Sequence, residues 1–497
     1  MSRKIKEKAT NSKYKTEMCS DEMSFDDCEL AILRHAVDES DIIMKKKIVN
    51  SPDVNKIINV LESFLRNKGL ICYGGTAINN ILPKSDQFYD KELDIPDYDF
   101  YSPSALEDAV ELADIYYKLD FKQVEAKAGV HHGTYKVFVN FIPIADITFI
   151  EKKIFNSIKA ESINMEGILY APANFLRMNM YLELSRPAGD VSRWEKILKR
   201  LVLLNANYPI EDQNCSKVEF QRELTKENSL NHKTIFECVR DTFINDNVVF
   251  FGGYATTLYS EYMPLKHRRL LSSNPDFDVL SMNPLRTATI VCMNLKGKGI
   301  KTAFTTKHES IGEIIPLHYE IRIGKETVAF IYQPIACHSY NTIDVNGKSV
   351  NVATIDTMLA FYLAFYYMDK PYYFQDRIMC MTNFLFEVEQ RNRLEQKGLL
   401  KRFTISCYGN QKSLSDLRSE KSEMHKTLKV GSKEYQSWFL NYVPGKKKRF
   451  IPNNARHKSK LRYGDNFDKN RKTRRPPRGN KYRQSNSIVS AIFKAYK

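Results

Sequence analysis

Two segments decide the fold of this chain, LICYGGTA at residues 70–77 and PDYDF at residues 96–100. The first is a short apolar run that enters two glycines and continues in a helical pattern up to Pro83, which is typical of strand, tight turn and helix. The second alternates apolar and polar residues as a strand does. Asp97 and Asp99 are two residues apart, so both side chains are expected on one face of that strand.

A third segment supplies another carboxylate. PIAD at residues 143–146 lies inside the apolar run Phe138–Ile150, which predicts a further strand that contains Asp146. Nucleotidyl transfer by two divalent ions needs hard oxygen ligands, and Asp is the residue type expected there. A Gly-Gly turn at the start of a helix lets backbone amides approach phosphate closely. The ordered set therefore predicts a phosphoryl-transfer site with Asp97, Asp99 and Asp146 as its carboxylates.

The same set recurs later, with one difference. The second copy reads FGGY at residues 251–254, PDFDV at 275–279 and PIAC at 334–337. The interval from Gly-Gly to Asp-x-Asp is 22 residues in the first copy (97 minus 75) and 23 in the second (276 minus 253). Pro-Ile-Ala precedes both Asp146 and Cys337, so we expect Cys337 to stand where the first copy has its third carboxylate. A neutral thiol is a poor ligand for Mg²⁺. The second copy is predicted to be a scaffold that has lost catalysis and that binds RNA or mediates dimerisation.

The predicted fold class is α/β (α+β), with two tandem units that each contain a small mixed sheet and helices, the second unit being degenerate. The expected organisation is an N-terminal helical region at 1–68, a catalytic nucleotidyltransferase domain at 69–165, a helical segment completing the first unit at 166–240, a degenerate nucleotidyltransferase-like domain at 241–345, a C-terminal helical segment at 346–444, and a basic, disordered tail at 445–497.

Charge is concentrated at the C-terminal end. The chain of 497 residues has a formal net charge of +16, and residues 446–483 contain sixteen Lys or Arg against two Asp, a net +14. Such a segment is either a polyanion-binding arm or a targeting signal. The nine cysteines form no Cys-x-x-Cys pair, so neither a zinc site nor a disulfide framework is expected, and a reducing compartment is favoured. The most apolar run, Thr357–Met368, is too short to cross a bilayer and predicts a buried helix.

The motifs YGGTA (73–77), PDYDF (96–100) and IAD (144–146), with their degenerate second copy, resemble the DNA polymerase β-type nucleotidyltransferases. More narrowly, they resemble the poly(A) polymerase catalytic subunits of large cytoplasmic DNA viruses, the poxviruses and giant viruses. The long interval between Gly-Gly and Asp-x-Asp suits this viral branch. The resemblance implies template-independent addition of AMP from ATP to mRNA 3′ ends with two Mg²⁺ or Mn²⁺ ions.

The resemblance also implies roles for individual residues. Asp97 and Asp99 would bind both metals, and Asp146 would bind the metal that activates the RNA 3′-hydroxyl. Gly74, Gly75 and Thr76 would hold the triphosphate. The implied partners are the RNA 3′ end, ATP, and either a second copy of the chain or a viral processivity partner, with no membrane. The implied location is the cytoplasm of the infected host cell, with packaging in the virion.

Several other residues have two interpretations. Arg177, Arg193 and Lys196 either bind triphosphate or form a solvated helix face. His131 and His132 either face the site or lie on the surface, and Tyr73 and Tyr98 either stack on a base or pack in the core. Two rival functions also stay open at this point. One is a different nucleotidyltransferase of the same fold, with another nucleotide or a small-molecule product, and the other is a non-catalytic RNA-binding subunit.

Overall fold

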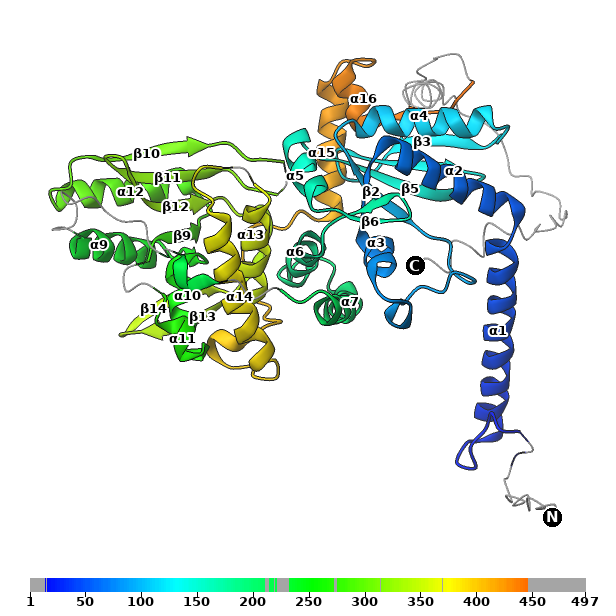
Figure 1. The fold of residues 1–497 in the computed structure, drawn as a ribbon, viewed down its shortest axis with the longest axis horizontal. Coiled ribbons are helices and arrows are strands. Elements are labelled where there is room, and N and C mark those ends of the chain that lie inside the picture. The colour runs from blue at the N-terminus through cyan, green and yellow to red at the C-terminus, as the bar shows by residue number, and fades with distance from the viewer. Residues whose placement is uncertain are drawn as a thin grey trace, which may run out of the picture.

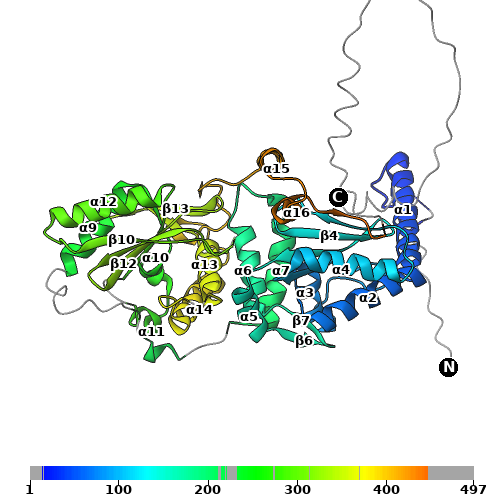
Figure 2. The same ribbon diagram turned by 90° about the horizontal axis from the view of Figure 1, so that it is seen from above.

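A computed structural model describes residues 14, 16–210, 214–218, 220, 232–271, 275–312, 314–368 and 370–445. Most of the basic tail, residues 446–497, lies outside this part of the chain, so its prediction stays a prediction. Figures 1 and 2 show two units side by side, each built around one sheet.

The first unit contains an eight-stranded mixed sheet with the order β16-β3-β4-β5-β2-β1-β7-β6. Its strands are β1 (Ile71–Tyr73), β2 (Tyr98–Ser102), β3 (Val124–Ala128), β4 (Thr134–Val139), β5 (Ile142–Phe149), β6 (Ile163–Met165), β7 (Ile168–Tyr170) and β16 (Asn441–Tyr442). The run Phe138–Ile150, predicted as one strand, contains a turn, because Asn140 and Phe141 have φ values of 51° and 66°. The turn joins β4 to β5 as an antiparallel pair.

The second unit contains another eight-stranded sheet, with the order β10-β11-β12-β9-β8-β14-β13-β15. Its strands are β8 (Val249–Phe250), β9 (Phe277–Leu280), β10 (Ala303–His308), β11 (His318–Ile323), β12 (Glu326–Tyr332), β13 (His338–Val345), β14 (Lys348–Ala353) and β15 (Cys407–Tyr408).

Both sheets have the same topology. In the first, β1 is antiparallel to β2 and parallel to β7, and β2 is parallel to β5. In the second, β8 is antiparallel to β9 and parallel to β14, and β9 is parallel to β12. Even the register shift between β4 and β5 has its counterpart between β11 and β12. The predicted duplication and the mixed α/β fold class are confirmed.

Helices cover the sheets and join the units. Those of the first unit are α2 (Pro52–Lys68), α3 (Gly74–Ile81), α4 (Ala105–Lys118), α5 (Lys152–Ala160), α6 (Ala173–Leu184) and α7 (Trp194–Asn207). Those of the second are α9 (His232–Asn245), α10 (Gly253–Tyr259), α11 (Leu265–Arg268), α12 (Pro284–Gly297), α13 (Ile355–Tyr366) and α14 (Gln375–Arg391).

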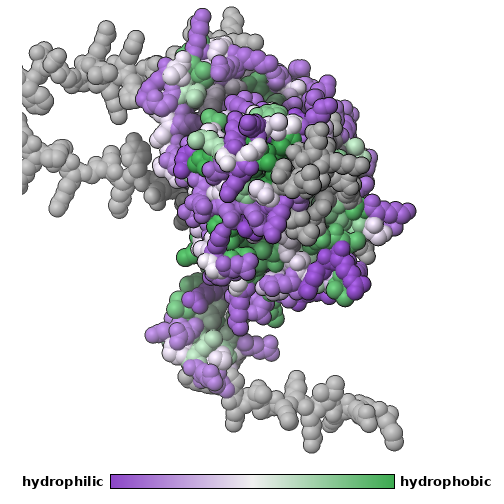
Figure 3. Space-filling view, turned by 90° about the vertical axis from the view of Figure 1, so that its left-hand side faces the viewer, coloured by the Kyte–Doolittle hydropathy of each residue, from purple (hydrophilic) through white to green (hydrophobic). Residues whose placement is uncertain are grey.

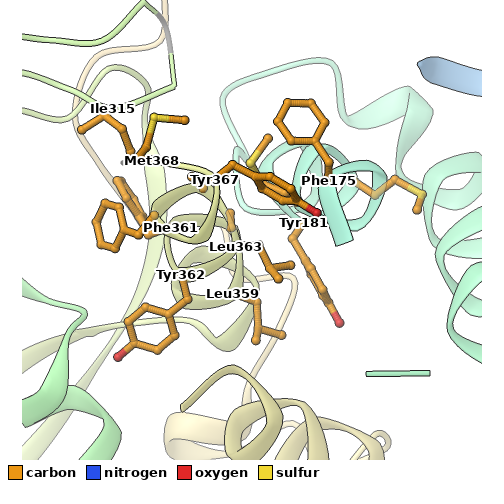
Figure 4. Packing of buried hydrophobic residues seen from close by; sticks show 14 of the residues in the cluster. Phe175, Tyr181, Ile315, Leu359, Phe361, Tyr362, Leu363, Tyr367 and Met368 are labelled. Atoms are coloured by element: carbon orange, nitrogen blue, oxygen red, sulfur yellow. The ribbon is translucent and has the colours of Figure 1, made fainter. Parts of the chain in front are cut away.

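The two units meet where α6 packs against α13. Every residue of α13 except Tyr366 is buried, as predicted from its apolar sequence. Phe175 of α6 contacts Tyr367, at the end of α13, edge-to-face with ring centroids 5.2 Å apart, and Figure 4 shows Tyr181 of α6 beside the same helix. The Tyr181 hydroxyl donates a 2.8 Å hydrogen bond to Glu389 of α14. Burial of large aromatic side chains on both sides fixes the units relative to each other.

The N-terminal part is helical, as expected. The helix α2 begins at a Ser51 N-cap followed by Pro52, and it ends at Gly69 in the left-handed conformation, so the predicted start and stop signals are confirmed. The preceding helix α1 (Phe25–Val49) extends away from the body of the molecule (Figure 1) and buries only Cys28 and Val49.

The end of the described chain returns to the first unit. The helices α15 (Leu414–Thr427) and α16 (Lys433–Phe439) lie over the first sheet in Figure 1, and β16 pairs with β3 at its edge. Lys421 donates a 2.5 Å hydrogen bond to the Gly129 carbonyl. Residues expected to close the second unit therefore complete the sheet of the first.

The cysteines give a correction. Six of the nine form disulfides, Cys19–Cys28, Cys215–Cys380 and Cys337–Cys407, although no disulfide framework was expected. Two of these pairs are separated by 165 and 70 residues, so local spacing carries no sign of them. Among the described residues, no helix is both long and apolar enough to cross a membrane.

Candidate active site

The Gly-Gly turn connects β1 directly to the N-terminus of α3. Gly74 has a φ of 75°, in the left-handed region that favours glycine. A Cβ atom at this position would lie 2.4 Å from Oδ2 of Asp99, so a side chain there would displace that carboxylate. Gly74 is therefore needed both for the backbone conformation and for the position of Asp99.

The three predicted carboxylates meet at β2 and β5, two adjacent strands in the middle of the first sheet. Asp97 directly precedes β2, and Asp99 lies within it. Asp146 lies on the parallel neighbour β5, where it is the direct register partner of Asp99. The predicted convergence of two strands at the Gly-Gly turn is therefore present.

The carboxylates on β2 and β5 crowd negative charge together. Burial, together with Asp97 and Asp146, raises the pKa of Asp99 to about 8. Desolvation and the charge of Asp146 also raise the pKa of Asp97. Carboxyls with raised pKa values in a cluster are typical of sites that bind cations or carry out proton chemistry.

Lys136 is a site residue that the motifs did not reveal. It lies on β4 as the register partner of Asp146, and its ammonium group forms an ion pair with Oδ2 of Asp146. The Lys136 side chain is 40% exposed and that of Asp146 is 19% exposed. An alternating strand that contains one Lys gives no sequence signal for such a pair, because the cross-strand register has to be known.

The carboxylates of this site fit one particular mode of binding a divalent ion. Across the described ranges, no group of three or more His, Cys, Asp or Glu side chains is placed to hold one ion jointly. Mg²⁺ is commonly bound by one or two carboxylates together with substrate phosphates and water. The donor set of Asp97, Asp99 and Asp146 fits that mode of binding and does not fit a closed cage.

Cations from α7 lie beside the turn. A Cβ on Gly75 would lie 2.9 Å from Nη1 of Arg200 and 2.6 Å from the Tyr89 hydroxyl. Arg200 is buried, donates a 2.7 Å hydrogen bond to Tyr89 and stacks over Phe88 at 4.7 Å. It follows Arg193 and Lys196 at helical spacing, a signal that could have identified it.

The predicted triphosphate candidates separate into two groups. Arg193 is exposed, and its charge opposes the rise in the pKa of Asp99. Desolvation, then Arg200 and Arg193, lowers the pKa of Lys196, so these three cations lie close together. Arg177 is fully buried and donates 2.7 Å to Asn205, so neither interpretation given for it applies and it is a structural residue.

Thr76 is placed beside the carboxylates but faces inward. Its side chain is buried, and its hydroxyl donates a 2.6 Å hydrogen bond to the Asp97 carbonyl. This bond ties the first turn of α3 to the segment that holds Asp97. The hydroxyl proton is therefore already used within the protein.

The other candidates serve packing. His132 stacks on Trp438 at 4.2 Å and so docks α16, and His131 is exposed. Tyr73 stacks on Tyr101 at 3.9 Å. The Tyr98 hydroxyl donates 2.8 Å to Glu62. The structural interpretation holds for these side chains.

The second unit has no carboxylate at the position that Asp146 holds in the first. The residue at that position is Phe330 and not the predicted Cys337. In the register of β9 with β12, Asp278 lies opposite Phe330, as Asp99 lies opposite Asp146. Cys337 lies beyond β12 and is bonded to Cys407. The prediction that Cys337 corresponds to Asp146 was therefore wrong. It depended on a short Pro-Ile-Ala match, and the pairing of β9 with β12 cannot be read from the sequence. The expectation of a missing carboxylate is correct.

An arginine stands beside the remaining carboxylates of the second unit. Nη2 of Arg377, on α14, lies 3.6 Å from Oδ2 of Asp276, and both side chains are largely buried. Gly252 is in contact with Asp278, since a Cβ there would lie 2.0 Å from Oδ2 of Asp278. The second unit thus keeps the steric arrangement of the turn while a fixed cation balances its charge.

Comparisons with known proteins agree with this geometry. Residues 59–190, which include the Gly-Gly turn and the three predicted carboxylates, match the model of the family described as "Poly(A) polymerase catalytic subunit". A candidate poly(A) polymerase catalytic subunit of Acanthamoeba polyphaga mimivirus is 29% identical over 262 residues, 51% of this chain and 43% of that protein. One of African swine fever virus is 33% identical over 175 residues, 34% of this chain and 36% of that protein.

A solved structure extends the likeness to nearly the whole fold. The crystal structure of the Megavirus polyadenylate synthase matches with a TM-score of 0.73 at 19% identity, covering 92% of this chain and 93% of that one. The sequence matches span less than half the length of the relatives. The resemblance predicted from the motifs is confirmed.

Proposed function

We propose that this chain, whose residues 59–190 belong to the poly(A) polymerase catalytic subunit family, is a polynucleotide adenylyltransferase. It adds AMP from ATP to mRNA 3′ ends without a template. The observation that supports this most is the placement of Asp97, Asp99 and Asp146 on adjoining strands beside Gly74. The family match covers all of these residues.

The chain's own residues have separable roles in this reaction. Asp97 and Asp99 would hold both metals, Mg²⁺ or Mn²⁺, and Asp146 would hold the one that serves the RNA 3′-hydroxyl. When bound, the ions supply positive charge that neutralises the triphosphate and makes the 3′-hydroxyl easier to deprotonate. Gly74, Gly75 and the backbone of Thr76 receive the triphosphate, because the N-terminus of α3 favours anions there.

Cations of α7 complete the phosphate side of the site. Arg200 approaches Gly75, and Arg193 and Lys196 lie close to it. These side chains neutralise phosphate oxygens that face away from the carboxylates and hold the α-phosphorus in line for attack.

The reaction is tested by incubating purified protein and an RNA primer with each nucleoside triphosphate separately. Extension by ATP alone is expected. Extension by a different nucleotide, or a small nucleotide product, would instead favour another transferase of the same fold.

Matched substitutions in the two units test the site. Asp97→Ala and Asp99→Ala should abolish extension while RNA binding persists, because they remove metal ligands and leave the RNA surface intact. Asp278→Asn, at the equivalent position of the second unit, should leave extension unchanged. Retained extension in the first pair would point to the non-catalytic RNA-binding alternative.

RNA binding by the basic tail belongs to the same proposal. Deleting residues 446–497 removes the segment that carries most of the net charge of +16. Affinity for RNA should fall and its salt dependence should flatten, by about 0.7 in slope for each lost contact with a single-stranded phosphate. An unchanged slope would assign the tail to targeting. We place the enzyme in the infected-cell cytoplasm and in the virion.

We assign a second copy of the chain as the protein partner, in preference to a separate processivity factor. The helix α1, about 37 Å long at 1.5 Å per residue, projects from the body and carries apolar side chains beside polar ones (Figure 3). Its exposed apolar residues are Phe25, Leu30, Ile32, Leu33, Val37, Ile42, Ile43 and Met44.

Charge complementarity within α1 favours pairing with itself. Acidic residues lie in its first turn and basic residues in its last. If two copies pair antiparallel about Val37, Asp27 meets Lys47 of the other copy and Glu29 meets its Lys45. Opposite charges at such flanking positions set helix orientation.

A further inference from the structure

The two units provide an internal comparison for Lys136. In the first sheet Lys136 lies opposite Asp146, and in the second the corresponding register pair is Glu320 and Phe330. The correspondence is secure because both strand pairs have a register shift one residue later, after Val137 and after Ile321. The lysine and the third carboxylate are therefore present together in one unit and absent together from the other.

The cations beside the carboxylates also differ in burial and in their contacts. Arg377, in the second unit, has a side chain 8% exposed and forms a cation–π contact with Phe374 at 5.4 Å. Lys136 has a side chain 40% exposed, and Asp146 is its only ion-pair partner among the described residues. A lysine is a single point charge on a flexible stem, whereas an arginine is a planar fork that binds carboxylates more rigidly. One unit thus has a fixed cation and the other an exchangeable one.

We propose that Lys136 is a positioning residue, a resident ammonium that holds the Asp146 carboxylate until a divalent ion replaces it. The ammonium and the ion compete for the same carboxylate oxygen, so the site does not retain the ion tightly before nucleotide arrives. Nucleotide phosphates add ligands for the ion and shift the competition in its favour. This inference rests on the proposed function for the identity of the metal site.

Mn²⁺ binding to the full-length protein, measured by electron paramagnetic resonance without nucleotide or RNA, tests this directly. Lys136→Met removes the charge and keeps the side-chain length, so the dissociation constant for Mn²⁺ should fall about two- to fivefold, as for loss of one partly exposed ion pair. Lys136→Arg, which binds the carboxylate through two bonds, should shift it in the opposite direction.

Lys127→Met is the matched control. Lys127 is the register partner of Lys136 on β3, is 45% exposed and pairs with Glu125. The substitution removes an equal charge from the neighbouring strand, but Lys127 itself has no contact with Asp146. An equal effect of Lys127→Met and Lys136→Met would reduce the finding to general electrostatics and overturn the proposal.

A double-mutant cycle shows whether Lys136 acts through Asp146. In an Asp146→Asn background, Lys136→Met should no longer change Mn²⁺ affinity, because the carboxylate for which the two cations compete is gone. The same shift in both backgrounds would contradict the proposal. Thermal melting of each variant confirms that the fold is kept.

The readout separates this inference from the proposed function. If the Lys136 series shifts Mn²⁺ affinity in the predicted order but no adenylate is added to RNA, the metal site stands and the assigned reaction fails. If adenylate is added and the series leaves Mn²⁺ affinity unchanged, the reaction stands and Lys136 has no role in metal exchange.

Discussion

Replacing Gly74 by alanine should separate the cost of an unfavourable backbone from the cost of a displaced carboxylate. Gly74 has a φ of 75° and Gly347 a φ of 78°. Alanine is unfavourable in this left-handed region, so at either position it should lower the free energy of unfolding by a similar amount, about 1–2 kcal/mol. The two sites differ in their surroundings. A Cβ on Gly74 would lie 2.4 Å from Oδ2 of Asp99, whereas nothing lies within 4 Å of one on Gly347. Gly347→Ala is therefore the matched control.

The catalytic effect follows from the missing space. Ordinary contact begins at 3.4 Å, so Asp99 or the turn has to move by about 1.0 Å (3.4 minus 2.4) to accept the methyl group of Gly74→Ala. A misplacement of about 1 Å at a catalytic group costs on the order of a hundredfold in rate. RNA extension by Gly74→Ala should fall at least that far.

Both quantities are measurable on the same preparations. Melting temperatures should drop in both variants, and further in Gly74→Ala because the clash with Asp99 adds to the backbone penalty, and primer extension should be lost only in Gly74→Ala. If both variants lose stability equally and keep wild-type extension, Asp99 does not need the position that the structure gives it, and the argument for the Gly-Gly turn fails.

Three other expectations concern charge and association. Because the folded-state pKa of Asp99 is raised to about 8, its ionisation destabilises the fold increasingly as pH rises from about 4 to 8, so Asp99→Asn should melt higher than wild type at pH 8 and equally below pH 4. Arg377→Met removes the cation that lies 3.6 Å from Asp276 in a buried site and should lower the free energy of unfolding by about 3 kcal/mol, with RNA extension per folded molecule unchanged. Val37→Asp should lower the mass seen by light scattering from dimer to monomer, while Ile42→Asp, about 140° further round α1, should not. A monomeric wild type, or a mass restored only by a separate protein, would rule out self-pairing.

Local features of the sequence predicted local structure well. The apolar strand, the Gly-Gly turn, the Asp-x-Asp strand and the caps at Ser51 and Gly69 all depend on neighbours within a few residues. The features that the sequence did not predict depend instead on residues far apart in the chain. Lys136 and the disulfide Cys215–Cys380 depend on register or on contacts between distant segments. The turn at Asn140 and Phe141 was missed because two non-glycine residues adopt positive φ there, within a largely apolar stretch.

Packing in the second unit explains why its Gly-Gly and Asp-x-Asp elements are kept although the third carboxylate is missing. Gly252 leaves no room for a side chain because Asp278 is in contact with it, and Asp276 is held by Arg377. Gly-Gly and Asp-x-Asp therefore fit each other sterically, so changing one element alone would create a clash or a buried unpaired charge. The strands that carry Lys136 and Asp146 have no such constraint. In the second unit the corresponding residues are Glu320 and Phe330. The first two elements are common to both units, and the residues that differ between them are Lys136 and Asp146 on β4 and β5 against Glu320 and Phe330 on β11 and β12.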